Sequence, residues 1–374
     1  MIIKNALIYT PQHRFEPGTL TIRGGRITAL DVPLPDEEVI DATGLLALPG
    51  LVDLHFHGAM GHDFCDGDED GLQAIADYEA QHGVLAICPA TMTYPEEKLN
   101  GIMDAAKAHR NDRGADLVGI NMEGPFISPH KVGAQNPAYV MGGDTEMFRR
   151  LQQRSGNLIK LVDVAPEEDG NLDFIRTVKD EVRVGVAHTC ADYDTARKGF
   201  QCGACQVTHL YNAMPGIAHR APGPVIAALE YGAHVELIAD GVHIHPAMVR
   251  FTFRTFGAGR VILISDSMMA TGLTDGDYSL GGQAVTVQGN RAVLTEKPET
   301  VAGSVTNLYD CMRTAISMGI SAEDAVLAAT ENPAKALGIE KDYGTLRPGS
   351  WGNVVLADEM LAIRHVIRRG ELIK

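Results

Sequence analysis

The chain has 374 residues, of which 45% are hydrophobic, so it is long enough to bury a large core. Its net charge of −16 and aromatic content of 6% argue against a nucleic-acid partner, which would need a basic surface and stacking side chains. No run approaches the roughly 18 apolar residues that cross a bilayer, and residues 1–15 lack the pattern of a targeting peptide. Six scattered cysteines are expected to be reduced thiols. We therefore expect a cytoplasmic protein without a membrane partner.

Short strand-like segments, punctuated by glycine and proline, occupy the first 49 residues and return after residue 342. Because the ends of a domain often lie close together, the two segments can combine into one unit. We predict a small β-sandwich domain built from residues 1–49 and 343–374. It would flank a larger domain formed by residues 50–342.

The middle of the chain alternates between apolar, β-branched runs and helix-like amphipathic stretches such as 71–82, 96–109, 172–181 and 192–201. The strand-like runs are 50–57, 83–91, 117–124, 159–167, 182–189, 205–213, 234–243 and 260–267. Eight strand–helix units predict an α/β fold with a (β/α)8 TIM-type barrel. A doubly wound open sheet is the alternative, weakened by the absence of a glycine-rich phosphate loop after the first strand.

Ionisable side chains end nearly every one of these runs. They are His55, His57, Glu123, His188, His209, Asp240, His243 and Asp266. The carboxyl ends of barrel strands build the active site in this type of fold. Burying so many ionisable groups together requires a compensating cation.

The spacing of these residues supports a metal site. Side chains two apart on a strand point the same way, so His55 and His57 both face the barrel mouth while Phe56 faces away. Three other strand ends complete the set of ligands: Glu123, His188 and His209. Imidazole and carboxylate suit zinc, iron, cobalt or manganese, and five ligands favour two ions bridged by Glu123 over a single ion. Asp266, at the end of the eighth run, is positioned to contact the activated water.

Seven motifs resemble those of a known family. They are DLHFHG (53–58), NMEGPFISPHKVGAQNP (121–137), GVAHT (185–189), THLYNAMPGIAHRAPG (208–223), IADGVHIHP (238–246), ISDSMMATG (264–272) and TVAGSVTNL (300–308). Together they are similar to the amino-sugar-phosphate deacetylases of the amidohydrolase superfamily. The flanking β segments match the two-ended small domain of that superfamily, so the resemblance covers nearly the whole chain.

The resemblance implies metal-dependent hydrolysis of the acetamide of N-acetylglucosamine 6-phosphate. It implies a main ion on Glu123, His188 and His209, and a second ion in members that keep the His-x-His pair. It assigns the acid/base role to Asp266. The substrate-binding residues that it implies are Ala134, Gln135, Asn212, Ala213, Arg220, His243, Val301, Ala302 and Gly303. In such enzymes the arginine reaches the ligand of the neighbouring subunit, so we expect a homodimer.

The chain departs from the family pattern at three positions. It has Ala221 where relatives often have glutamate, Gln135 where some one-metal relatives have histidine, and Cys190 where aspartate or asparagine is usual. Several alternatives stay open. The substrate could instead be the epimer N-acetylgalactosamine 6-phosphate. The alternative function is that of a sugar-phosphate binding protein without catalytic activity. Relatives that bridge two ions with a carboxylated lysine fit less well, because none of the eight runs ends in lysine.

Overall fold

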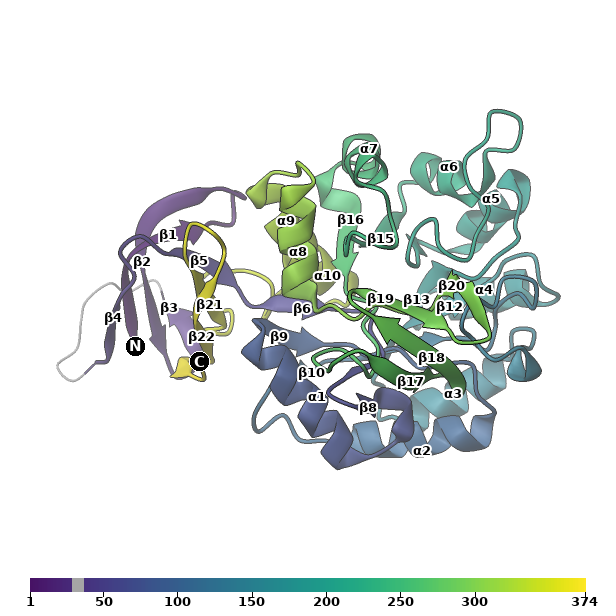
Figure 1. The fold of residues 1–374 in the computed structure, drawn as a ribbon, viewed down its shortest axis with the longest axis horizontal. Coiled ribbons are helices and arrows are strands. Elements are labelled where there is room, and N and C mark those ends of the chain that lie inside the picture. Colours follow the sequence, from purple (N-terminus) through teal and green to yellow (C-terminus); the bar gives the residue numbers. More distant parts are fainter. Residues whose placement is uncertain (29–36) are drawn as a thin grey trace.

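Residues 1–28 and 37–374 are described by a computed structural model (Figure 1). Strands from both ends of the chain form one mixed β-sheet with the strand order β23-β22-β21-β5-β1-β2-β3. Strand β4 pairs with β1 beside this series. These strands are β1 (Ile2–Tyr9), β2 (Phe15–Arg23), β3 (Arg26–Thr28), β4 (Val39–Asp41), β5 (Leu46–Pro49), β21 (Val354–Ala357), β22 (Ile363–Arg368) and β23 (Glu371–Leu372). The two chain ends therefore meet where β21 pairs with β5. The strands belong to one hydrogen-bonded sheet, with a small core that includes Ile3, Ile22 and Leu356.

Parallel strands form the centre of the larger part of the molecule. They are β6 (Leu51–Asp53), β9 (Val84–Ile87), β10 (Asp116–Leu117), β11 (Ile120–Glu123), β12 (Ile159–Val164), β13 (Arg183–Val186), β14 (Gln206–Val207), β15 (His234–Ile238) and β16 (Val261–Ile264). Hydrogen bonding groups them as β10-β9-β6 and as β11 through β16 in chain order. Each of the eight predicted runs contains such a strand. The first strand of each run starts within one residue of the run, and the 117–124 run also contains a second strand, β11, which starts at Ile120.

Backbone hydrogen bonds also connect the two parallel sheets at both outer edges. On one side, the amide of Thr91, just beyond β9, donates to the carbonyl of Asn121 on β11 at 2.8 Å. On the other side, the amide of Asp266 donates to the carbonyl of His55 at 3.0 Å, and the amide of His57 donates to Ser267 at 2.7 Å. The residues that follow β6 and β16 are thereby held side by side.

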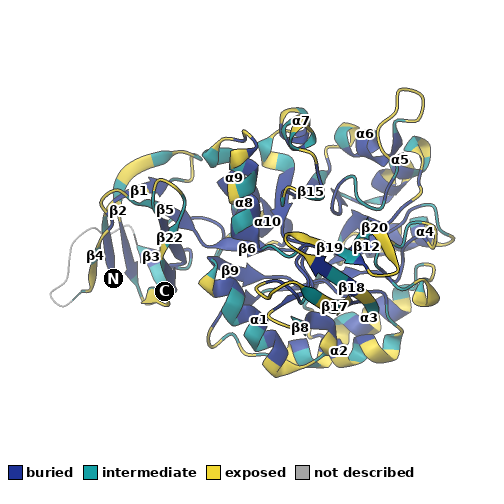
Figure 2. Ribbon diagram, in the orientation of Figure 1, coloured by how far each residue is buried: buried dark blue, intermediate teal, exposed yellow. Residues whose placement is uncertain are grey.

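Helices follow most of the parallel strands and cover their outer faces (Figures 1 and 2). They are α1 (Glu69–Gln81), α2 (Glu96–Ala108), α3 (Thr145–Arg154), α4 (Asn171–Val178), α5 (Tyr193–Cys202), α6 (Gly223–Glu230), α7 (Pro246–Phe256), α8 (Leu308–Ser317), α9 (Ala322–Ala329) and α10 (Glu331–Ala336). Several begin where an aspartate, asparagine or serine side chain accepts a hydrogen bond from the first turn, as Asp68 does for α1 and Asp192 for α5. The four helices predicted from amphipathic stretches are confirmed as α1, α2, α4 and α5.

The amino ends of the parallel strands are closed by apolar side chains. Val52 and Ile262 from the strands pack in one cluster with Ala334 and Leu337 of the α10 region. All four side chains are buried. Below the site described next, the interior is therefore filled with hydrocarbon.

A four-stranded antiparallel sheet interrupts the alternation after β16. It consists of β17 (Gly276–Leu280), β18 (Gln283–Gln288), β19 (Arg291–Leu294) and β20 (Lys297–Val301). The sequence reading missed this sheet, although Gly281–Gly282 and Gly289–Asn290 are typical hairpin turns between alternating segments. Within the described residues, no helix is both long and apolar enough to span a membrane.

Candidate active site

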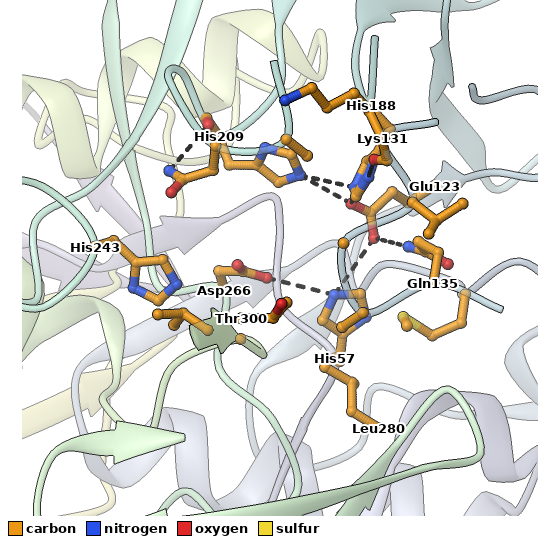
Figure 3. Close-up of a pocket in the computed structure, with 18 of the residues that line it drawn as sticks. His57, Glu123, Lys131, Gln135, His188, His209, His243, Asp266, Leu280 and Thr300 are labelled. Carbon is orange, nitrogen blue, oxygen red and sulfur yellow. Dashed lines mark hydrogen bonds and ion pairs between the residues drawn. The ribbon is translucent and has the colours of Figure 1, made fainter. Parts of the chain in front are cut away.

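The predicted metal ligands gather around one cavity at the carboxyl ends of the parallel strands. The cavity has a volume of about 490 Å³. Figure 3 shows His57, Glu123, His188, His209 and Asp266 pointing toward one another within it. His55 is fully buried behind this wall and does not line the cavity itself.

Glu123, the last residue of β11, lies at the centre of the group. Its Oε1 is 2.9 Å from Nε2 of His188 and 3.1 Å from Nε2 of His209. Oε1 is also 3.6 Å from Nε2 of His55, whereas Oε2 is 3.4 Å from Nε2 of His57. One carboxylate therefore faces both halves of the predicted ligand set, which is the arrangement that a bridging role requires.

The side chains that could bind metal form two compact groups, and within each group the oxygen and nitrogen atoms that could ligate lie within 4.8 Å of one another. The groups are His55, His57 and Asp266, and Glu123, His188 and His209. Nε2 of His188 and Nε2 of His209 are 3.1 Å apart, and a tetrahedral ion with bonds of about 2.0 Å separates its ligand atoms by about 3.3 Å. Nε2 of His55 is buried without a hydrogen-bond partner among the described residues, a defect that a cation would correct. The side chains fit two divalent ions.

The electrostatics of the group favour ionised carboxylates. Burial alone would raise the pKa of Glu123, but the charge of His55 and the hydrogen bonds from His188 and His209 outweigh it and hold the pKa well below its usual range. Burial would likewise raise the pKa of Asp266, and its hydrogen bond with His57 and the nearby imidazole charges lower it instead. Both carboxyl groups therefore favour the ionised form, which is the form that attracts a cation.

The backbone at the strand ends is strained. His188, His209 and Asp266 have φ values of 42°, 29° and 50°, in the left-handed region that side chains other than glycine rarely adopt. Such residues cost about 1–3 kcal/mol each and persist where the surrounding structure fixes them. All three carry a side chain that points into the cavity (Figure 3). The strained backbone therefore lies at residues whose side chains need a fixed orientation for the predicted chemistry.

Two hydrogen bonds fix the orientation of ligands. Nδ1 of His188 lies 2.8 Å from the carbonyl oxygen of Lys131, and because a carbonyl only accepts, Nδ1 is the protonated nitrogen of a neutral ring. Nε2, which faces Glu123, is then the nitrogen that can bind a metal. The amide nitrogen of Gln135 donates to Oε2 of Glu123 at 2.8 Å, while its Oε1 accepts from the backbone of Thr93 at 2.6 Å. The Gln135 side chain is thus used to hold Glu123.

The structure brings most of the predicted substrate-binding residues to the cavity wall. Those that line it are Ala134, Gln135, Asn212, Ala213, His243, Val301 and Gly303. Asp240 holds His243 through a 2.7 Å contact between Oδ2 and Nδ1. Ala302 is fully buried outside the lining, and Arg220 lies exposed on the loop before α6, with Nη1 2.6 Å from Nε2 of His219. Cys190 is exposed and does not line the cavity.

Other lining residues were missed in the sequence. They are Met92, His130, Lys131, Val132, Gly133, Leu280, Lys297, Glu299 and Thr300. Leu280, Lys297, Glu299 and Thr300 belong to the antiparallel sheet, which closes one side of the cavity (Figure 3). The side-chain amide of Gln283 on β18 donates to the backbone carbonyls of Ala134 and Gln135 and so ties this sheet to the opposite wall. Recognising the two glycine turns would have indicated the sheet but not its position.

Comparisons with known proteins agree with this site. A family model described as the amidohydrolase family matches residues 46–373. The chain is 34% identical to the N-acetylglucosamine-6-phosphate deacetylase of Bacillus subtilis, over 100% of this chain and 96% of that protein. It is 32% identical to the N-acetylgalactosamine-6-phosphate deacetylase of Escherichia coli O157:H7, over 99% of this chain and 98% of that protein.

Solved structures give the same result. The crystal structure of N-acetyl-D-glucosamine-6-phosphate deacetylase from Mycobacterium smegmatis superposes with a TM-score of 0.92 at 31% identity, over 100% of both chains. A variant of that protein with an aspartate replaced by alanine, in complex with N-acetyl-D-glucosamine-6-phosphate, has a TM-score of 0.91 at 31% identity, over 100% of this chain and 98% of that chain. The family resemblance predicted from the motifs is confirmed.

Proposed function

The chain belongs to the amidohydrolase family, and we propose that it hydrolyses the acetamide of N-acetylglucosamine 6-phosphate to glucosamine 6-phosphate and acetate, as a step of amino-sugar catabolism. The observation that carries the proposal is the position of Glu123 between two groups of ligands, with Asp266 across the same cavity. An amide is a poor electrophile with a poor leaving group, so its hydrolysis needs an activated water, a polarised carbonyl and a proton for the amine. This site offers residues for each need.

The proposed fold is a closed (β/α)8 barrel of residues 50–342 beside a small domain of residues 1–49 and 343–374. The hydrogen bonds that join the two parallel sheets at both edges support a closed ring of strands. The proposed boundary near residue 343 is supported by the packing, because Tyr343 contacts the core inside the parallel strands whereas Leu346 belongs to the core of the terminal sheet.

We assign the metal ligands as predicted: Glu123, His188 and His209 for one divalent ion, His55 and His57 for the second, with Glu123 shared. When bound, divalent metal supplies the Lewis acidity that activates water and polarises the amide carbonyl. The chain's own contribution is to orient the imidazoles toward one another and to keep the carboxylate of Glu123 between them.

Asp266 is the proposed general base and acid. Its carboxylate is ionised at rest, for the electrostatic reasons given above, and lies 3.4 Å from Nε2 of His57 at the cavity wall. It takes a proton from the attacking water as the new carbon–oxygen bond forms, then returns that proton to the amine nitrogen as the carbon–nitrogen bond breaks. Water is consumed, and acetate and the free amine leave.

The phosphate and the sugar would be held by donors around the cavity. His243, kept in place by Asp240, and the backbone near Asn212 and Ala213 line the wall beside Asp266. Arg220 lies on an exposed loop outside the cavity. We propose that it reaches the phosphate in the site of a neighbouring subunit, where its planar fork can bind two oxygens.

Release of acetate tests the proposal directly. Purified protein loaded with a divalent metal should release stoichiometric acetate and primary amine from N-acetylglucosamine 6-phosphate. A parallel assay with N-acetylgalactosamine 6-phosphate decides which epimer is the substrate. The galacto epimer stays an alternative because one relative is a deacetylase of that sugar phosphate. Binding of both sugars without any hydrolysis would indicate a silent binding protein instead.

Metal analysis tests the two-ion assignment. We expect two ions per subunit in the native protein and one after His55 and His57 are both changed to alanine. A single ion that is unaffected by this double change would mean that Glu123 does not bridge. Elemental analysis of the same samples identifies the metal, because the ligand set itself accepts zinc, iron, cobalt and manganese.

A further inference from the structure

Glu236 on β15 is a fully buried carboxylate that lies just beneath the metal ligands. Its Oε2 is 2.9 Å from Nδ1 of His55 and accepts the backbone amide of His209 at 3.1 Å. Its Oε1 accepts the side-chain amide of Gln206 on β14 at 2.5 Å. One side chain therefore contacts residues of β14 and two candidate metal ligands, and no step described above uses it.

The contact with His55 determines which imidazole nitrogen carries the proton. A carboxylate has no proton to donate, and Glu236 already accepts hydrogen bonds from Gln206 and from the backbone of His209, so Nδ1 of His55 is the donor in the third contact. The lone pair of a neutral His55 ring is then on Nε2. That nitrogen is buried without a hydrogen-bond partner and faces Oδ1 of Asp266 at 3.8 Å and Oε1 of Glu123 at 3.6 Å.

We propose that Glu236 is a positioning residue for the second metal site: it holds His55 as the Nδ1–H tautomer and aims Nε2 at the ion. The proposal rests on the two-ion part of the proposed function. A carboxylate that accepts the second ring N–H of a ligating histidine fixes the ring and makes it a stronger ligand. Because Glu236 touches His55 by its side chain but His209 only through the backbone, its influence is greatest on the second ion.

Asp163 on β12 provides a matched control. It is also a fully buried carboxyl group inside the parallel strands, but its Oδ1 accepts from the hydroxyl of Thr208 at 2.6 Å and its Oδ2 has no partner among the described residues. No hydrogen bond or ion pair of the described structure joins it to a histidine. Replacing each acid by its amide removes a buried carboxyl group at nearly constant volume, and only Glu236→Gln changes a group that contacts a ligand.

Metal titration is the decisive experiment. Metal-free wild type, Glu236→Gln and Asp163→Asn are titrated with Zn²⁺ in competition with a chelator, and two dissociation constants are fitted. We expect the weaker constant of Glu236→Gln to rise about 10- to 100-fold, with the tighter one changed less than threefold. Asp163→Asn should match wild type in both. The turnover of Glu236→Gln should recover as the free Zn²⁺ concentration is raised.

The outcomes separate the two proposals. Two ions in wild type with unchanged constants in Glu236→Gln would overturn the role of Glu236 alone. One ion in wild type would overturn the two-ion assignment and the role of Glu236 with it, while leaving the deacetylase activity to its own assay. Equal losses in both variants would mean a general effect of altering the interior, which also overturns the proposal.

A measurement on unaltered protein keeps the proposal testable if Glu236→Gln does not fold. In zinc-loaded wild type labelled with ¹⁵N-histidine, the signals of His55 are identified by their loss in His55→Asn. We expect a protonated Nδ1 and a zinc-bound Nε2 for this ring. Zinc bound through Nδ1, or a proton on Nε2, would overturn the assignment.

Discussion

The two ends of the same parallel strands bury different kinds of side chain. At the amino ends, Val52, Ile262 and Leu337 pack in a hydrocarbon cluster with the α10 region. At the carboxyl ends, imidazoles and carboxylates face one another, and three buried imidazole nitrogens have no hydrogen-bond partner among the described residues: Nε2 of His55, Nδ1 of His57 and Nδ1 of His209. Between them lies a thin polar layer that includes Glu236.

This difference teaches how one set of strands serves both stability and chemistry. The amino ends gain free energy by removing apolar surface from water. The carboxyl ends lose free energy, because they hold strained backbone at His188, His209 and Asp266 and concentrate ionisable groups. We therefore expect substitutions at the two ends to separate activity from stability, and each prediction below tests that separation.

The largest effect is expected at the carboxyl end. Asp266→Asn keeps the shape of the side chain but removes the proton acceptor, so kcat should fall by about three to five powers of ten. The metal content and the free energy of unfolding should stay close to those of wild type. Steady-state kinetics, elemental analysis and urea unfolding of the same preparation test this, and near-wild-type turnover would contradict the mechanism.

The converse effect is expected at the amino end. Leu337 is almost completely buried in the cluster that closes the strands, so Leu337→Ala should lower the free energy of unfolding by about 2–4 kcal/mol. Because the cavity lies at the other end, KM and metal stoichiometry should not change at a temperature where the variant is folded. Urea unfolding and kinetics at 25 °C provide the comparison. A loss of metal in this variant would show that the two ends are not independent.

A third prediction asks how far the carboxyl-end site extends. Arg220 lies on an exposed loop and does not line the cavity. We nevertheless propose that it binds the phosphate of the substrate held in a neighbouring subunit. Arg220→Ala should raise KM for the phosphorylated sugar by about 10- to 100-fold and leave weak turnover of the unphosphorylated sugar unchanged. Arg364→Ala on β22, another exposed arginine, is the control. Equal effects on both sugars would contradict the assignment of Arg220 to the phosphate. A monomer in sedimentation analysis would contradict the proposal that Arg220 acts in a neighbouring subunit.

How much the sequence could predict also differs between the two ends. Apolar runs located a strand in each of the eight units, with the first strand starting within one residue of its run, because this signal is local. Strand-end positions likewise indicated the side chains that form the two candidate metal-binding groups. The left-handed backbone at His188 and His209 could not be predicted, since tertiary contacts impose it. Likewise, Lys297 and Thr300 reach the cavity through a sheet whose docking depends on contacts across about 150 residues of chain, such as that of Gln283 with Ala134.

The smallest predicted effect concerns pH and the amino end. His234 begins β15, and burial together with the charges of Arg183, Arg260 and Lys335 lowers its pKa to about 4. In the unfolded chain its pKa is about 6.5, so between these values the unfolded state binds the extra proton. The stability that depends on a neutral His234 is complete above about pH 6.5 and is lost as the pH falls toward 4.

Replacing His234 by glutamine removes this proton uptake. Between pH 7 and pH 5 the free energy of unfolding should therefore fall less in His234→Gln than in wild type, by up to about 2 kcal/mol before screening by salt. Protonation of the metal ligands also destabilises the protein in acid, but it affects both proteins equally and cancels in the comparison. Urea unfolding at both pH values measures the difference. Equal losses in the two proteins would mean that burial and the surrounding cations do not lower the pKa of His234 in the folded protein.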